Sequence, residues 1–341
     1  MSRYWQAILT SLVLCVGVFA LDCDLADAAV AKSVDDDAAA AEISVAPNTV
    51  TLGLYLTSLY DFDMAKRSFN AVFWAWFKSS DPAFKPLATV EVTNARTVVN
   101  RYDYKQEPSQ DGGTVITAAK YYVNITQDWD TVYFPFDRQT LKIYFEDSAS
   151  DLSAMKFVPD VGNSGIDAPV SIPGWTIERF SVYADDSSYD SNFGSDGASV
   201  PSRYSRFVAE ISVKRTGMRL FLNIYAGFFV AFLLTFLTYF MDVHSMAGNR
   251  IGLCGGAIFA SVGNKYIVDN TLPLTSQFTL TDSVELATFS AIVICIITAL
   301  SVKALEERHT GAAKVINGFF GGTSLIGYIA AIGLMIFKSN V

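Results

Sequence analysis

The second half of the chain alternates between uncharged apolar runs and short polar connections. The runs 220–241, 286–302 and 315–337 contain no charged residue, and each is long enough to cross a bilayer as a helix. A fourth stretch, 250–273, is a poor span by hydropathy, because it carries four glycines and several polar residues between its apolar ones. The pattern predicts four transmembrane helices, at about 217–241, 250–271, 284–303 and 315–337.

One face of the stretch 250–273 has no aliphatic side chain. Projected at about 100° per residue, this narrow face consists of Gly252, Gly256, Phe259, Gly263, Tyr266 and Asn270. Polar positions within membrane helices usually face a bundle interior or water, so the face could line a pore. Alternatively, the small residues could serve close helix packing. A pore would require several copies of the chain around a symmetry axis.

Residues 46–215 lack such long apolar runs. They consist of short runs rich in Val, Thr, Tyr, Phe and Trp, separated by Pro, Gly, Asp and Ser. Several runs alternate with a period of two, as half-buried antiparallel strands do. Seven or more such strands predict an all-β, immunoglobulin-like sandwich. The predicted fold is therefore this sandwich followed by an all-α bundle of four transmembrane helices at 216–341.

The first residues have the pattern of an export signal. Residues 1–28 combine an early basic residue, an apolar core and a small-residue cleavage site after Ala28, although a retained anchor is an alternative. Residues 29–45 are acidic and alanine-rich, which predicts a linker. A signal peptide would place the β domain outside the cytoplasm.

Composition narrows the class of function. Hydrophobic residues make up 51% of the 341, and the mean hydropathy of +0.30 indicates a membrane protein with a sizeable soluble part. The two histidines fall on predicted cytoplasmic loops, and we find no catalytic set, metal cluster or phosphate-binding glycine loop, so we expect no enzyme, no metal and no cofactor. The net charge of −9 without basic stripes argues against nucleic acid as a partner.

Several motifs occur in the order found in a known family. They are the sequence FPFDRQ at 134–139, Trp76 with Asp81-Pro82, Gly174-Trp175, Arg215 before the first helix, and Leu272-Pro273 with Asp282. Together they resemble the pentameric ligand-gated ion channels, in particular the prokaryotic members. Animal members close the FPFD loop with two cysteines, whereas Gln127 and Leu141 stand at those positions here.

This resemblance implies a homopentamer in the bacterial inner membrane, with its N-terminal domain outside and its pore lined by the second helix. Its partners would be lipids, permeant monovalent ions and a small-molecule or proton agonist. The six residues of the narrow face would line the pore, and a ring of Phe259 would form a hydrophobic gate. Packing of Phe259 against a neighbouring helix is the alternative, as is a membrane-tethered receptor that conducts nothing.

The resemblance places an agonist site between neighbouring β domains. One wall would hold Tyr102, Tyr104, Glu146, Tyr183, Tyr189 and Phe193, and the other Trp76 and Tyr122. Aromatics with carboxylates suit an ammonium ligand through cation–π contacts, although the loop 183–204 also reads as a solvated hairpin. Proton gating would have to use carboxylates such as Asp185, Asp186 and Asp190.

Selectivity and coupling complete the expectations. Arg250 at the inner mouth would favour anions, whereas Asp269 at the outer mouth and the acidic β domain favour cations, which we expect to be the permeant ions. The residues expected to couple the two domains are Asp63, Phe134, Pro135, Phe136, Asp137, Arg215 and Pro273. Arg215 would pair with one of the two carboxylates, Asp63 or Asp137.

Overall fold

The computed structural model describes residues 47–104, 107–108, 113–194, 200–242, 246–272, 277–306 and 309–340. The expected signal peptide at 1–28, the whole linker at 29–45, its boundary with the β domain and Pro273 lie outside these ranges. The signal peptide, the linker, its boundary and the coupling role of Pro273 therefore stay predictions.

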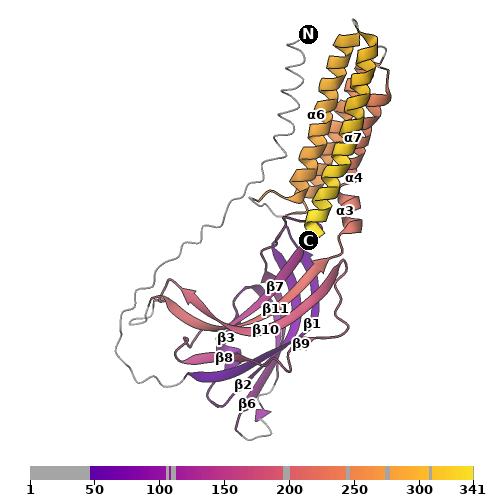
Figure 1. Ribbon diagram of the computed structural model, residues 1–341. Helices are drawn as coiled ribbons and strands as arrows, with labels where there is room; N and C mark the ends of the chain where they lie inside the picture. Colours follow the sequence, from indigo (N-terminus) through magenta and orange to yellow (C-terminus); the bar gives the residue numbers. More distant parts are fainter. Residues whose placement is uncertain are drawn as a thin grey trace. The chain divides into compact units, whose positions relative to one another are not determined.

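The N-terminal part consists of two β-sheets (Figure 1). The larger sheet has the order β4-β6-β2-β1-β8, with β5 beside β6 and β9 beside β1. Its strands are β1 (Asn48–Asp63), β2 (Ser68–Ser79), β4 (Ala95–Asp103), β5 (Glu107–Pro108), β6 (Val115–Thr126), β8 (Met155–Pro159) and β9 (Gly165–Ile166). The smaller sheet has the order β10-β11-β7-β3, formed by β3 (Val90–Val92), β7 (Arg138–Asp147), β10 (Trp175–Tyr189) and β11 (Ser202–Arg215). A short helix, α2 (Pro86–Thr89), precedes β3.

The two sheets share one hydrophobic core, which makes this part a sandwich. Alternate residues of β1, from Val50 to Leu56, are fully buried, as the period of two requires. The ring of Phe145 on β7 packs edge-on against Phe73 and Phe77 on β2, at centroid distances of 5.8 Å and 6.3 Å. The predicted β-sandwich followed by helices is confirmed.

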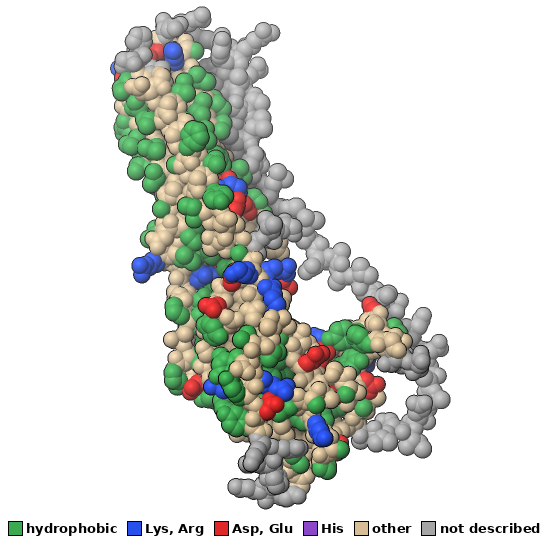
Figure 2. All heavy atoms as spheres, turned by 180° about the vertical axis from the view of Figure 1, so that it is seen from behind, with side chains coloured by type: hydrophobic (Ala, Val, Ile, Leu, Met, Phe, Trp, Pro, Cys, Tyr) green, Lys and Arg blue, Asp and Glu red, His purple; other side chains and the backbone are tan. Residues whose placement is uncertain are grey.

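The C-terminal part is helical, with α4, α6 and α7 lying side by side (Figure 1). Among the described residues, three helices are long and apolar enough to cross a membrane: α5 (Ala247–Asp269), α6 (Leu280–Glu306) and α7 (Thr310–Asn340). A fourth candidate span is bent by 56° between α3 (Met218–Ile224) and α4 (Ala226–Leu237), which continues as η1 (Thr238–Phe240). Figure 2 shows hydrophobic side chains over much of one face of these helices.

A contact between α4 and α5 lies just after the bend. The amide of Gly227, at the start of α4, donates a hydrogen bond of 3.2 Å to the side-chain oxygen of Asn264 on α5. A Cβ at position 227 would overlap Asn264, so only glycine allows this approach. The bent first span is thus attached to the helix that carries the candidate pore face.

Candidate functional site

The loop before β7 holds a buried ion pair at the base of the sandwich. Arg215, the last residue of β11, donates from Nε to Asp137 Oδ1 at 2.7 Å and from Nη2 to Oδ2 at 3.3 Å. The Asp137 side chain is 2% exposed and that of Arg215 11%. Gln139 donates a further hydrogen bond of 2.7 Å to Asp137, and the guanidinium lies 3.9 Å from the ring centroid of Trp175.

The same loop touches the helices directly. The hydroxyl of Tyr225, between α3 and α4, donates to the carbonyl of Phe134 at 3.1 Å and lies 2.7 Å from the hydroxyl of Thr281 on α6. The amide of Leu280, where α6 begins, donates to the carbonyl of Val132 at 2.7 Å. The loop therefore contacts the start of the first span and the start of α6 together.

Packing at this junction is tight. The ring of Phe136 lies 5.4 Å from that of Phe221 on α3. A Cβ at Gly217, just before α3, would overlap the carbonyl oxygen of Pro135. Because only a hydrogen fits there, the chain can pass from β11 to α3 within contact of the loop.

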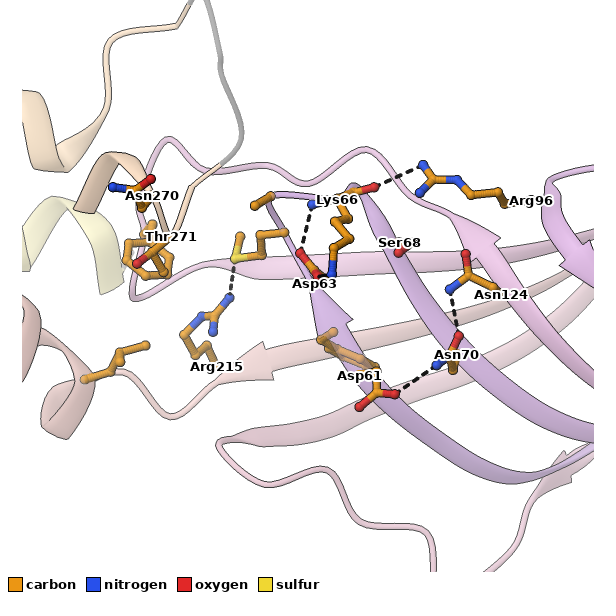
Figure 3. Close-up of a pocket in the computed structure, with 15 residues that line it drawn as sticks. Asp61, Asp63, Lys66, Ser68, Asn70, Arg96, Asn124, Arg215, Asn270 and Thr271 are labelled. Carbon is orange, nitrogen blue, oxygen red and sulfur yellow. Dashed lines mark hydrogen bonds and ion pairs between the residues drawn. The ribbon is translucent and has the colours of Figure 1, made fainter. Parts of the chain in front are cut away.

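Asp63 is not part of the ion pair. Its carboxylate lies 2.9 Å from the Lys66 ammonium, and hydrogen bonds from the Lys66 amide and side chain hold the pKa of Asp63 below its usual value. Arg215 and Asp63 nevertheless line one cavity of about 750 Å³ between the β1–β2 loop and the helices. Figure 3 shows Asn270 and Thr271, at the end of α5, on the helical side of this cavity.

The predicted pore-facing residues share one surface of α5. All six are exposed, with Phe259 at 81% and Tyr266 at 72%, whereas Cys254, Ala257 and Val268 on the other side are buried in the bundle. No described atom lies within 4 Å of where a Cβ would stand at Gly252, Gly256 or Gly263. Within one described chain, then, neither the glycines nor Phe259 serve helix packing.

The two residues expected to set selectivity have different surroundings. Arg250 is fully buried, and its Nη2 donates to the side-chain oxygen of Asn317 on α7 at 2.7 Å. It therefore does not lie on the exposed face with Gly252. Asp269 is 57% exposed and lies 3.7 Å from Lys265, whose ammonium is 2.8 Å from Glu285 on α6.

The expected agonist-binding residues fall into separate groups. On the smaller sheet, the Tyr189 hydroxyl donates to Glu146 at 2.8 Å, and its ring packs 5.4 Å from Phe193 and 5.9 Å from Tyr204. Arg206 on β11 also binds the Glu146 carboxylate, and its guanidinium lies over the Tyr144 ring at 4.7 Å. Burial alone would lower the pKa of Arg206, but the hydrogen bond and charge of Glu146 outweigh it and raise the pKa.

On the larger sheet, Tyr102 and Tyr122 pack edge to face at 5.8 Å, and the Lys120 ammonium lies 5.6 Å from the Tyr122 ring centroid. Tyr104 packs at 4.6 Å against Trp74, which the sequence analysis did not select. Trp76 instead donates its indole N–H to Asp160 at 2.9 Å.

The remaining candidates of the β10–β11 hairpin have partners of their own. The Tyr183 hydroxyl donates to Glu210 at 3.1 Å. This contact links Tyr183 neither to the Tyr189 cluster nor to the Tyr102–Tyr122 pair. Asp186 forms an exposed ion pair of 2.8 Å with Arg203. Asp185 accepts a hydrogen bond of 2.8 Å from the Asp186 amide.

The geometry defines a class: a β-sandwich joined through its loops to an apolar helix bundle, one helix of which keeps a bare face. No family model matches the chain. The chain is 27% identical over 157 residues to a proton-gated ion channel of Gloeobacter violaceus, a match that covers 40% of this chain and 43% of that protein. The chain thus spans less than half the length of this relative. The match confirms the resemblance to the prokaryotic pentameric ligand-gated ion channels, and the relative is a channel, not an enzyme.

Proposed function

We propose that the chain is one subunit of a homopentameric, ligand- or proton-gated ion channel of the bacterial inner membrane, with residues 46–215 outside the cytoplasm and 216–341 forming the pore domain. The observation that carries the proposal is the exposed face of α5. The narrow face of this helix, which is not buried in the bundle, carries three glycines, the polar Asn270, Phe259 and Tyr266 and no aliphatic side chain, a composition that suits water better than lipid. A water-filled pore between several copies would provide that water.

In this proposal the six residues of the exposed face line the pore, and Phe259 forms its narrowest ring. Five phenyl rings around an axis would exclude water when they approach one another, which closes a pore by dewetting. Glycine at positions 252, 256 and 263 leaves the wall wide elsewhere.

The permeant ions are cations. The position of Arg250 supports this, because a guanidinium buried against Asn317 does not present its charge to the pore face. Asp269, which is more than half exposed near the outer end of α5, would add a ring of carboxylates that is partly neutralised by Lys265. The acidic β domains would enrich cations further.

The agonist would act between neighbouring β domains. Its candidate contacts are Tyr102, Tyr104, Glu146, Tyr183, Tyr189 and Phe193 on one wall, and Trp76 and Tyr122 on the other. Because Arg206 already occupies the carboxylate of Glu146, an ammonium ligand would have to displace it. The name of the relative, a proton-gated channel, makes protons the first agonist to test.

Binding would open the pore through the junction. Phe134, Pro135, Phe136 and Asp137 touch the helices or Arg215, and Pro273 follows the end of α5. A rotation of the β domain would reach α3 and α6 through these contacts, provided that they differ between the closed and the open state.

Current recording from the purified full-length chain in planar bilayers, with unequal salt on the two sides, tests the proposal. We expect a drop in pH, or else a primary amine, to open a current that reverses near the cation equilibrium potential. Phe259→Ala should raise the current without agonist, whereas Phe319→Ala, which removes an exposed phenyl ring from α7, should not. Reversal along the chloride gradient would transfer the selectivity to anions. Silence of both wild type and Phe259→Ala would favour a receptor that conducts nothing.

A further inference from the structure

Two cysteines meet in the interior of the helix bundle. Cys254 on α5 and Cys295 on α6 are 41 positions apart in the sequence, but their Sγ atoms lie 3.7 Å apart. Cys254 is 1% and Cys295 0% exposed, and both are free thiols. Sulfur atoms at this distance are in contact without being bonded.

The contacts of the pair orient it. The Cys254 thiol donates toward the Cys295 sulfur, and the Cys295 thiol in turn donates toward the carbonyl of Thr235 at 3.7 Å. The Thr238 hydroxyl lies 2.8 Å from the same sulfur, and Thr238 in turn donates to the carbonyl of Thr235 at 2.7 Å. Both sulfurs therefore have fixed partners, with Cys254 directed at the atom to which it would bond.

A positive charge lies close by. Arg250 precedes Cys254 by one helical turn on α5 and is fully buried. Its Nη2 binds Asn317, but its Nε and Nη1 have no hydrogen-bond partner among the described residues. The guanidinium therefore lies in the same buried part of the bundle as the two sulfurs.

We propose that Cys254 and Cys295 form an oxidation site that is converted to a disulfide by a small neutral peroxide. The sulfur of Cys295 attacks one oxygen of hydrogen peroxide, the O–O bond breaks, and sulfenic acid forms while the departing hydroxide takes the thiol proton and leaves as water. The sulfur of Cys254 then attacks the sulfenic sulfur, and its proton and the hydroxyl leave as a second water. Two thiols and one peroxide give one disulfide and two waters.

Bond formation would require the sulfurs to close from 3.7 Å to the bonding distance of about 2.05 Å. The pair packs with Ala231 and Ala257, two of the smallest side chains, in one buried cluster. No described atom lies within 4 Å of where a Cβ would stand at Gly255 or Gly256, which follow Cys254. Burial excludes large reagents, so the site should discriminate in favour of small oxidants.

The bond would tie α5 to α6. If α5 lines a pore, as proposed above, a covalent link five residues before Phe259 would hold the gate helix against its scaffold. This consequence rests on the proposed function, whereas the chemistry of the site does not.

The chemical test uses the purified full-length chain in lipid vesicles. After exposure to hydrogen peroxide, the chain is denatured, alkylated and digested, and its peptides are weighed. We expect a linked pair of the peptides carrying Cys254 and Cys295, about 2 Da lighter than their sum. Cys295→Ser, or Cys295→Ala if the serine variant folds poorly, should lack this species. The proposal is overturned if both cysteines are recovered alkylated from the folded chain while a chain denatured before the treatment becomes linked.

Recording currents from the same vesicles separates this inference from the proposed function. We expect peroxide to change the agonist-evoked current of the wild type and to leave Cys254→Ser and Cys295→Ser unaffected. The linked peptides in a chain that never conducts would keep the oxidation site and refute the channel. Conduction by a chain that never yields the linked peptides would keep the channel and refute the oxidation site.

Discussion

Replacing Arg215 by glutamine removes one partner of a buried ion pair. Asp137, which is 2% exposed, would keep only the Gln139 amide at 2.7 Å as a hydrogen-bond donor of comparable strength. Breaking a buried pair from one side costs about 3–5 kcal/mol, because a desolvated charge is left behind. Because Asp137 keeps the hydrogen bond from Gln139, we expect Arg215→Gln to lie at the lower end of this range and to lower the free energy of unfolding by about 3 kcal/mol.

A double-mutant cycle measures the pair itself. Asp137→Asn and the double variant Arg215→Gln/Asp137→Asn complete the cycle, and we expect a coupling energy of about 2 kcal/mol, since the double variant has no buried charge. Unfolding of the solubilised chain by guanidinium chloride can be followed by tryptophan fluorescence, because the Trp175 ring lies 3.9 Å from the guanidinium group of Arg215. Arg203→Gln, which breaks the exposed pair with Asp186, is the matched control and should cost less than about 1 kcal/mol. Single costs that simply add, within about 0.5 kcal/mol, would refute the reasoning.

The same unfolding assay tests three further predictions. Gly217→Ala should lose about 1–3 kcal/mol, because the new methyl group overlaps the carbonyl oxygen of Pro135; an unchanged midpoint would contradict this. Tyr225→Phe should lose about 1–2 kcal/mol with its two hydrogen bonds at the junction, and a neutral result would mean that water replaces them. Burial works to raise the pKa of Asp160, but hydrogen bonds from Trp76, Lys78 and Asn163 outweigh it and lower the pKa. This carboxylate therefore stabilises the fold above about pH 4 and ceases to do so as pH falls through its lowered pKa, so the wild type should lose more stability than Asp160→Asn between about pH 5 and pH 3.

The periodic features could be predicted from the sequence because they depend on local geometry. A helix turns by about 100° per residue, so the projection that grouped Gly252 with Phe259 needed no tertiary information, and the structure leaves those residues exposed together. The same rotation of about 100° per residue also predicts the position of Arg250, although we did not apply it to this residue. Arg250 stands two residues, or about 200°, from Gly252, which places its side chain on the opposite side of the helix.

Contacts between distant elements could not be predicted in this way. The sequence left Arg215 a choice between Asp63 and Asp137, and only the approach of the loop to the end of β11 decides it. Arg206 was missed because its partner Glu146 depends on the register of β11 against β7, which no spacing in the sequence records. The Cys254–Cys295 pair was missed for the same reason, since it exists only where two antiparallel helices pack.

The bare face of α5 has a consequence for how this surface can change. At Gly252, Gly256 and Gly263 the outer wall of the helix is the main chain itself, with open space beyond it. A substitution at these positions can only add atoms to that surface, because no side chain is present to remove. Substitution at these glycines can therefore only increase the volume of side chain on the exposed face. At Phe259, which is 81% exposed, substitution can either increase or decrease that volume.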